Sequence, residues 1–149
     1  MFVSQKSQYA LRAIFELSKH FGEGPVKVGS IANVQAIPPR FLEVILNQLK
    51  QDGIVTSRRG NEGGYSLANS PKTLTVGDIL RRVQGSLDPV NCVADIAENT
   101  CPLYGDCVFL PMWKDVKEAV LNVYDNTTFQ LLLDREKKNA EKSAFSYSI

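Results

Sequence analysis

A glycine-rich hinge at residues 59–64 separates two short segments, 54–58 and 65–68, in which polar and apolar residues alternate. This pattern predicts a β-hairpin, because glycine tolerates the backbone conformations that tight turns between strands require. Arg58 and Arg59 stand at the start of the hinge, so the hairpin is basic. A basic hairpin of this kind is typical of the wing of a DNA-binding domain.

Two helices are predicted directly before the hairpin. The first covers residues 29–35, and the second follows a turn through residues 36–38, starts at Pro39 and stops at Gly53. Proline suits a first helical turn because the amide there has no helical partner. We expect the second helix to bury a face made of Phe41, Leu42, Ile45, Leu46 and Leu49. Together these elements predict a winged helix-turn-helix, whose second helix enters the major groove of DNA while the wing reaches phosphates or the minor groove.

Two more helices complete this domain, which we place at residues 1–86. One is predicted over residues 7–20 and ends before two glycines. Its apolar stripe consists of Ala10, Ala13, Ile14, Leu17 and Phe21. The other covers residues 76–84 and is capped by Thr75. The predicted fold is therefore mainly α with a small β wing.

The C-terminal region predicts a long dimerisation helix. Its apolar residues step by 4, 3, 4 and 3 positions, as in a coiled-coil seam, which consists of Phe109, Trp113, Val116, Val120 and Val123. Leucines at 131–133 predict a further short helix, capped near Thr127 or Thr128. We assign residues 108–136 to dimerisation and residues 137–149 to a frayed polar tail.

Charge divides the chain into two parts that the overall net charge of +1 conceals. Residues 1–86 carry 11 Lys and Arg against 6 Asp and Glu, a balance of +5, and residues 87–149 carry 6 against 10, a balance of −4. This separation favours a nucleic-acid-binding part and a part with another role, although ordinary solvated charge is the alternative interpretation.

All three cysteines, Cys92, Cys101 and Cys107, fall in an acidic loop that we place at residues 87–107. Thiolates are soft ligands for iron-sulfur clusters and zinc, and they also react with oxidants. The odd number of cysteines and the lack of a secretory segment argue against a disulfide framework and favour a reducing cytoplasm. No run approaches the roughly 18 apolar residues that a membrane span needs, so we expect a soluble protein.

Four segments resemble the Rrf-type family of bacterial winged-helix transcription regulators. They are residues 7–13 (SQYALRA), 41–43 (FLE), 58–65 (RRGNEGGY) and 75–79 (TVGDI). The family includes the iron-sulfur cluster regulator, the nitric-oxide-sensitive repressor, the rhizobial iron regulator and the cysteine-metabolism repressor. The resemblance implies a cytoplasmic homodimer that binds a palindromic operator in double-stranded DNA, with the long helix crossing to the partner subunit near the sensor loop.

The resemblance also implies that the three cysteines hold an iron-sulfur cluster, of the 2Fe–2S or 4Fe–4S type. Cys101 and Cys107 enclose the family's usual five residues, whereas Cys92 and Cys101 enclose eight. The positions of the family's known fourth ligands hold Leu110 and Gln8 here. Three thiolates without such a ligand resemble the rhizobial iron regulator and imply one labile iron. The remaining ligand would come from Asp95, Glu98 or Asp106, from water or from a small thiol. A metal-free redox sensor and small buried residues are the alternatives for the cysteines.

The DNA contacts implied by the resemblance lie on the second helix of the pair and on the wing. These residues are Pro39, Arg40, Glu43, Arg58, Arg59 and Gly60. Arginine pairs with guanine or enters a narrow minor groove, and glutamate accepts a hydrogen bond from the cytosine amino group. Ser30 and Gln35 are expected at phosphates. A solvated helix charge is the alternative for Glu43, and we expect Arg81 and Arg82 to be surface charges.

The sequence therefore predicts a homodimeric transcriptional regulator, a repressor with a redox or iron sensor. A metal-free thiol-based or ligand-responsive repressor and a winged-helix adaptor that binds protein are the alternatives. An enzyme is not expected, because the chain has a single histidine and no phosphate-binding or triad motif.

Overall fold

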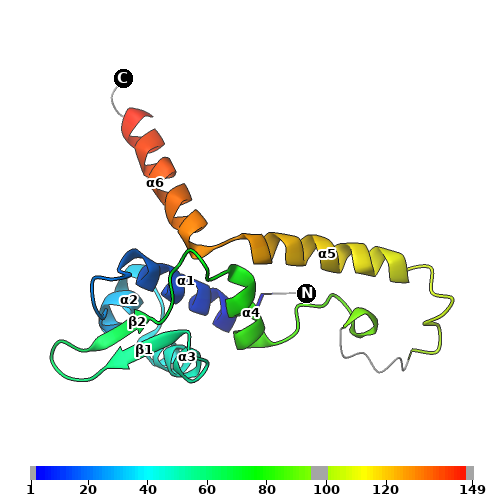
Figure 1. The fold of residues 1–149 in the computed structure, drawn as a ribbon, viewed down its shortest axis with the longest axis horizontal. Coiled ribbons are helices and arrows are strands. Elements are labelled where there is room, and N and C mark those ends of the chain that lie inside the picture. Colours follow the sequence, from blue (N-terminus) through cyan, green and yellow to red (C-terminus); the bar gives the residue numbers. More distant parts are fainter. Residues whose placement is uncertain (1–2, 95–100, 147–149) are drawn as a thin grey trace.

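The computed structural model describes residues 3–94 and 101–146, which form a mainly helical protein with one small sheet (Figure 1). In chain order the elements are α1 (Gln5–Lys19), α2 (Val28–Gln35), α3 (Pro39–Gln51), β1 (Val55–Arg58), β2 (Gly64–Leu67), α4 (Val76–Gln84), the short 3-10 helix η1 (Asn91–Val93), α5 (Leu110–Asn126) and α6 (Phe129–Ser146). The predicted fold class is confirmed.

The core lies between α1 and the helices and sheet that surround it. Four residues of the predicted α1 stripe are buried, Ala10, Ala13, Ile14 and Leu17. The prediction was wrong for Phe21, which is exposed. Because α1 ends at Lys19, helical periodicity no longer determines where the Phe21 side chain points.

Helix α3 buries a face with the spacing i, i+3, i+4 and i+7, which places Leu42, Ile45, Leu46 and Leu49 in the core. The prediction that Phe41 belongs to this face was wrong, since its side chain is 65% exposed. Phe41 precedes the first member of the stripe, and one residue corresponds to about 100° of rotation on a helix. It therefore lies at the side of the buried face.

The wing is an antiparallel hairpin that is held to the domain at its base. The register pairs Val55 with Leu67 and Arg58 with Gly64. Val26 extends the pairing, because its backbone N–H donates to Tyr65 O and its carbonyl accepts from the N–H of Tyr65. A side chain at Gly64 would place its Cβ 2.3 Å from Val26 O, so this close approach requires glycine.

Helix α4 begins with a capping box, as the sequence predicts. The hydroxyl of Thr75 accepts from the backbone N–H of Asp78, and the Asp78 carboxylate accepts from the backbone N–H of Thr75. The N–H of Val76 donates to Thr127 O at 2.9 Å, which joins the start of α4 to the junction between α5 and α6.

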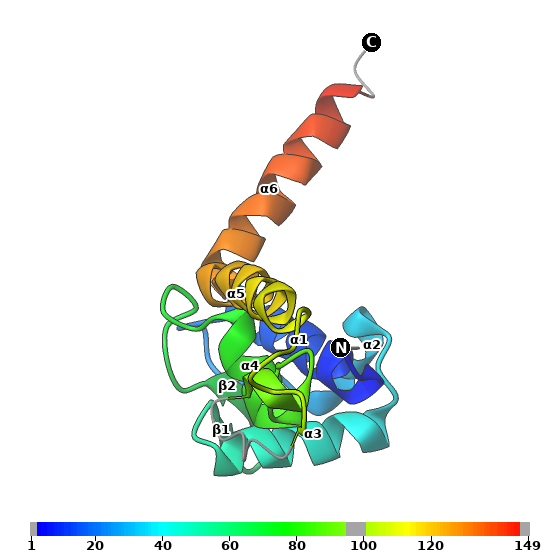
Figure 2. The same cartoon turned by 90° about the vertical axis from the view of Figure 1, so that its right-hand side faces the viewer.

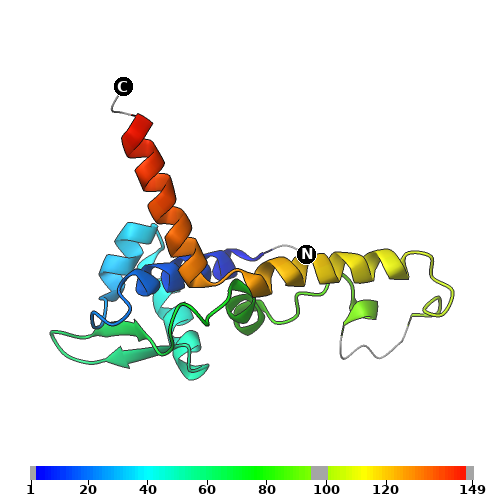
Figure 3. The ribbon, with the colours of Figure 1, turned by 45° about the horizontal axis from the view of Figure 1, so that its top comes forward.

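Helices α5 and α6 extend away from the winged domain (Figures 1 and 3). Helix α5 has no buried residue, whereas α6 inserts Phe129 fully into the core. The side chain of Thr128 caps α6 by accepting from the N–H of Leu131. The predicted short helix and frayed tail were wrong, because α6 continues to Ser146 through a segment rich in strong helix formers. No helix in the part that the structure describes is long and apolar enough to cross a membrane.

Candidate DNA interface and thiol loop

The N-terminal turns of α3 carry three predicted DNA contacts on an exposed surface. Pro39 occupies the first turn, and Arg40 and Glu43 follow it, all three exposed. Arg40 and Glu43 are three positions apart, so they neighbour each other on the helix surface. Because the buried stripe starts at Leu42, the side chains of Arg40 and Glu43 point away from the core.

The two predicted phosphate contacts on α2 have different surroundings. Ser30 is exposed near the start of the helix. Gln35 is half-buried, and its side-chain amide donates to Glu16 Oε2 at 2.8 Å. Glu16 is buried and also lies 3.7 Å from Lys19 Nζ. The structure therefore shows Gln35 tying α2 to α1, and its contact with a phosphate stays a prediction.

The wing and α3 form one basic surface. Arg58, Arg59 and Gly60 are all exposed. Together with Lys27 and Lys50 they line a shallow depression of about 570 Å³. The phenolic O–H of Tyr65 donates to Asn47 Oδ1 at 3.1 Å, so the wing is attached to α3 as well as to the chain that precedes α2. The four cations at this depression suit a phosphate backbone.

The three cysteines occupy separate positions along the thiol loop, which we define as residues 87–107. Cys92 is half-buried in η1, Cys101 is exposed, and Cys107 is half-buried just before α5. All three are free thiols. Among residues 3–94 and 101–146, no three His, Cys, Asp or Glu side chains lie close enough together to hold a metal ion. The structure does not bring the predicted ligands together.

The candidate fourth ligands are also distributed. Asp106 is exposed in the loop, and Asp95 and Glu98 lie outside the described residues. The side-chain amide of Gln8 donates to Val3 O at 3.1 Å, near the start of the chain. Leu110 is the first residue of α5. Among the described residues, Asp106 and the thiols form no cluster of three ligands.

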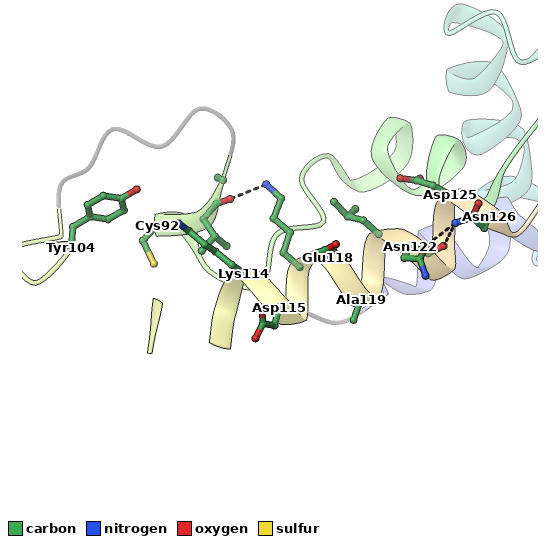
Figure 4. A pocket seen from close by; sticks show the side chains of 13 residues that line it. Cys92, Tyr104, Lys114, Asp115, Glu118, Ala119, Asn122, Asp125 and Asn126 are labelled. Atoms are coloured by element: carbon green, nitrogen blue, oxygen red, sulfur yellow. Dashed lines mark hydrogen bonds between the residues drawn. The ribbon is translucent and has the colours of Figure 1, made fainter. Parts of the chain in front are cut away.

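A depression of about 1140 Å³ separates the thiol loop from α5. Figure 4 shows Cys92 and Tyr104 on its loop side and Lys114, Glu118 and Asn122 along the helix. The lining mixes thiol, phenol, ammonium and carboxylate groups. The loop therefore faces α5 across a polar space in which Cys92 is accessible.

One lysine of α5 holds the loop near Cys92. Lys117 Nζ lies 2.8 Å from Asp88 Oδ1 and donates to Val93 O at 2.8 Å. The side chains of Lys117 and Asp88 are each only 15% exposed. Burial raises the pKa of Asp88, but the hydrogen bonds from Lys117 and Ser86 outweigh burial, so the pKa lies below its ordinary value. The sequence did not predict this contact, because no short-range pattern relates Lys117 to Asp88 or Val93.

A second ion pair joins α5 to the winged domain. The guanidinium of Arg81 donates through Nη1 and Nη2 to the two carboxylate oxygens of Asp125, both at 2.7 Å. This pairing lowers the pKa of Asp125 below its ordinary value. Gly77 allows the contact, because a Cβ there would lie 2.0 Å from Asp125 Oδ1. Arg81 is thus a structural link between α4 and α5, beyond the surface charge that the sequence suggested.

The predicted dimerisation seam lies along α5, and none of its residues is fully buried in the described chain. Phe109 and Val123 are exposed, and Trp113, Val116 and Val120 are half-buried. Met112, which the periodic pattern omitted, is exposed beside them. An apolar strip of this kind on an extended helix is expected to be covered in solution.

The model of the Rrf2 family, described as iron-dependent transcriptional regulators, matches residues 3–135. The chain belongs to the Rrf2 family. Within this family it is 33% identical to the HTH-type transcriptional regulator CymR of Bacillus subtilis over the full length of both proteins. The similarity extends far beyond the four segments that carried the resemblance in the sequence. The protein is a transcriptional regulator.

Solved structures of Rrf2 relatives have the same fold. The structure of CymR, the global cysteine regulator of B. subtilis, superposes with a TM-score of 0.74 at 33% identity, covering 91% of this chain and 98% of that one. T. potens IscR superposes with a TM-score of 0.75 at 35% identity, covering 93% and 90%. The oxidised form of Staphylococcus aureus CymR gives a TM-score of 0.68 at 30% identity, covering 89% and 95%.

Proposed function

We propose that this Rrf2 regulator is a homodimer that binds a palindromic DNA operator, and that the chemical state of its thiol loop sets its DNA affinity. The observation that carries the proposal is a continuous set of contacts from the loop to the DNA-binding domain. Lys117 joins the turn that contains Cys92 to α5, and Asp125 joins α5 to α4 through Arg81.

The charge and shape of the winged domain support DNA as the partner. The exposed residues Arg40, Arg58 and Arg59 belong to α3 and the wing, and residues 1–86 carry the positive excess of the chain. We assign Arg58, Arg59 and Gly60 of the wing to phosphates or the minor groove. Pro39, Arg40 and Glu43 of α3 are assigned to base edges. Ser30 on α2 is exposed where a phosphate can reach it.

The partly exposed apolar seam of α5 supports the homodimer. Two copies of an apolar strip related by twofold symmetry bury each other, which is the common arrangement in soluble oligomers. A dimer of this kind places two copies of α3 against two half-sites about 34 Å apart along the duplex. A shift of α5 relative to α4 would change that spacing and hence the affinity for the operator.

The donor set of the loop fits an iron-sulfur cluster in its chemistry. Cys92, Cys101 and Cys107 are free thiols, and thiolates are the ligands of such clusters. Since these residues are apart in the described conformation, cluster binding would draw the loop together. When bound, the cluster would supply a centre that responds to iron, nitric oxide or oxidants. In the proposed mechanism, closure of the loop displaces Lys117 and with it α5. The protein would thereby shift its population between an open-loop and a closed-loop arrangement.

A metal-free thiol regulator is the second candidate. It is favoured by the exposure of Cys101 and by the similarity to CymR, the cysteine regulator, over the full chain. In that case oxidation of the thiols would rearrange the same loop and act through the same contacts. The two candidates differ in what occupies the loop and agree on how the loop reaches the DNA-binding domain.

Purification without oxygen, followed by iron and sulfide analysis and an absorbance spectrum, tests the cluster. We expect iron, sulfide and visible absorbance in the wild type, and loss of all three in Cys92→Ala, Cys101→Ala and Cys107→Ala. Val108→Ala is the matched control, since this exposed side chain neighbours Cys107 and offers no ligand. Iron-free wild type whose DNA affinity still changes on oxidation would contradict the cluster and favour the metal-free regulator. Failure of any form to bind DNA would contradict both.

A further inference from the structure

Two large apolar side chains of α3 stay outside the core. Phe41 is 65% exposed and Val44 is 61% exposed, and neither belongs to the hydrophobic clusters that hold the fold together. They are three positions apart on the helix, so their side chains are neighbours. Stability of the domain therefore does not account for a phenylalanine and a valine at these positions.

The apolar pair lies on an open surface between two supports of α3. On one side Asn47 accepts from Tyr65 of the wing. On the other side the Gln48 side chain accepts from Lys6 Nζ and donates to Arg82 O, which ties α3 to α1 and α4. Helix α3 runs along the outer edge of the winged domain, away from α5 and α6 (Figure 2). Val44 is 61% exposed on this surface.

The charges around the pair identify DNA as its occupant. Arg40 is exposed four positions before Val44 and lies on the same side of α3. Lys50, Arg58 and Arg59 line the adjacent depression at the wing. A surface with this many cations favours a polyanion, and the major groove also presents one apolar group, the 5-methyl group of thymine.

We propose that Val44 and Phe41 read thymine in the operator by packing against its 5-methyl group. The inference rests on the proposed DNA binding and deepens it by naming the base that this turn of α3 recognises. Glu43, between the two, is suited to the amino group of cytosine. The exposed turn of α3 would then distinguish pyrimidines through one charged and two apolar side chains.

The test replaces thymine by uracil, which lacks only the 5-methyl group and keeps every hydrogen-bonding group of the base. An operator is first selected from a randomised duplex library with the wild-type protein, and each thymine is then replaced in turn. We expect replacement of a contacted thymine to weaken binding about fourfold in each half-site, the value of one buried methyl group. Val44→Ala and Phe41→Ala should each abolish the preference for thymine at one position.

Two control variants separate methyl recognition from general effects. Val34→Ala removes the same side chain at the same 61% exposure, but on α2, and should keep the preference for thymine. Arg59→Ala should weaken binding to the thymine and uracil duplexes equally, because thymine and uracil do not differ at phosphates or in the minor groove, where we assign the wing. Thermal melting of each variant checks that the domain is folded.

Equal affinity of the wild type for thymine and uracil at every position would overturn the inference while leaving DNA binding intact. If the wild type instead binds no duplex, the proposed function itself fails. A change in oligomeric mass caused by Val44→Ala, with an unaltered preference for thymine, would assign this surface to a second copy of the chain and would also overturn the inference.

Discussion

Lys117 contacts both sides of the turn that contains Cys92. Its ammonium lies 2.8 Å from the Asp88 carboxylate, which precedes the cysteine, and 2.8 Å from the carbonyl oxygen of Val93, which follows it. A single side chain of α5 therefore bridges the two ends of the turn that carries this thiol. Any chemistry at Cys92 that displaces the turn must act against these two contacts.

The first prediction concerns this anchor. Lys117→Met keeps the length of the side chain but removes both contacts, so backbone amides at residues 88–94 should exchange hydrogen about tenfold faster, the value of one charged hydrogen bond of about 1.4 kcal/mol. The response of DNA affinity to the state of the thiols should shrink. Lys114→Met, an exposed position on the same helix, is the control. Hydrogen exchange that is identical in the three proteins would show that Lys117 does not hold the turn.

The second prediction concerns pH. Because the pKa of Asp88 is lowered in the folded protein, its stabilising effect is present above the unfolded value of about 3.9 and is lost as the pH falls through the lower folded value. The free energy of unfolding of the wild type should therefore exceed that of Asp88→Asn at neutral pH, with the difference disappearing under acid conditions. Asp106→Asn, at an exposed loop position, should follow the wild type. A difference that stays constant from neutral pH through the whole acid titration would contradict this account.

The third prediction concerns the junction of α4 and α5. Gly77→Ala would place a Cβ 2.0 Å from Asp125 Oδ1 and 2.8 Å from Arg81 Nη1, so the ion pair must move. The loss of this contact should cancel the gain of about 0.5–1 kcal/mol that alanine normally brings to a helix. Gly29→Ala, in α2, meets no atom within 4 Å and should show the full gain.

A double-variant cycle completes this test. Combining Gly77→Ala with Asp125→Asn should add little to either change alone, since both disrupt the same contact. Thermal or denaturant unfolding measures all four proteins. Additive effects would mean that Gly77 and Asp125 act independently, in conflict with their proximity.

The fourth prediction concerns the dimer. Val120→Asp places a charge in the seam of α5 and should give monomers or aggregates in sedimentation, because a buried charge without a partner is costly. Asn122→Asp is the matched control, since it adds the same charge at an exposed position away from the seam. If Val120→Asp still forms a dimer of the wild-type mass, the seam is not part of the dimer interface.

The fifth prediction separates the two DNA-contacting elements. Arg59→Ala should weaken binding to specific and non-specific duplexes alike and reduce the salt dependence by about one unit, because a backbone or groove contact carries little base identity. Glu43→Ala should leave non-specific binding intact and relax the preference at one base pair per half-site by about 1–3 kcal/mol. Salt titrations and competition with a randomised library measure both. If Glu43→Ala leaves the sequence preference unaltered, Glu43 is a solvated helix charge and does not read a base.

Short-range patterns were sufficient to predict most of the elements. Helix α4 begins at Val76 and ends at Gln84 as expected, because the Thr75 cap and the Gly85 stop act over a few residues. Helix α3 begins at Pro39 for the same kind of reason. The hairpin follows from its glycines, and the family resemblance in these motifs extends to the whole chain.

Such short-range patterns could not predict the long-range contacts. Arg81 and Asp125 are 44 positions apart, and Lys117 and Val93 are 24 apart, so no periodicity relates them. The side chain of Gln35 has several possible partners, and only the packing of α2 on α1 selects Glu16.

The amino-acid sequence by itself determined most of the helices, the wing, the basic DNA-binding half and the position of the cysteines, because caps, turns, periodicity and charge are local properties. The tertiary structure decided which apolar residues are left uncovered and which ion pairs connect the loop to the DNA-binding domain. Phe41 shows the difference, since its hydrophobicity suggested the core, whereas the docking of α3 leaves it exposed. Burial depends on how elements pack against one another, and that is settled only when distant segments meet.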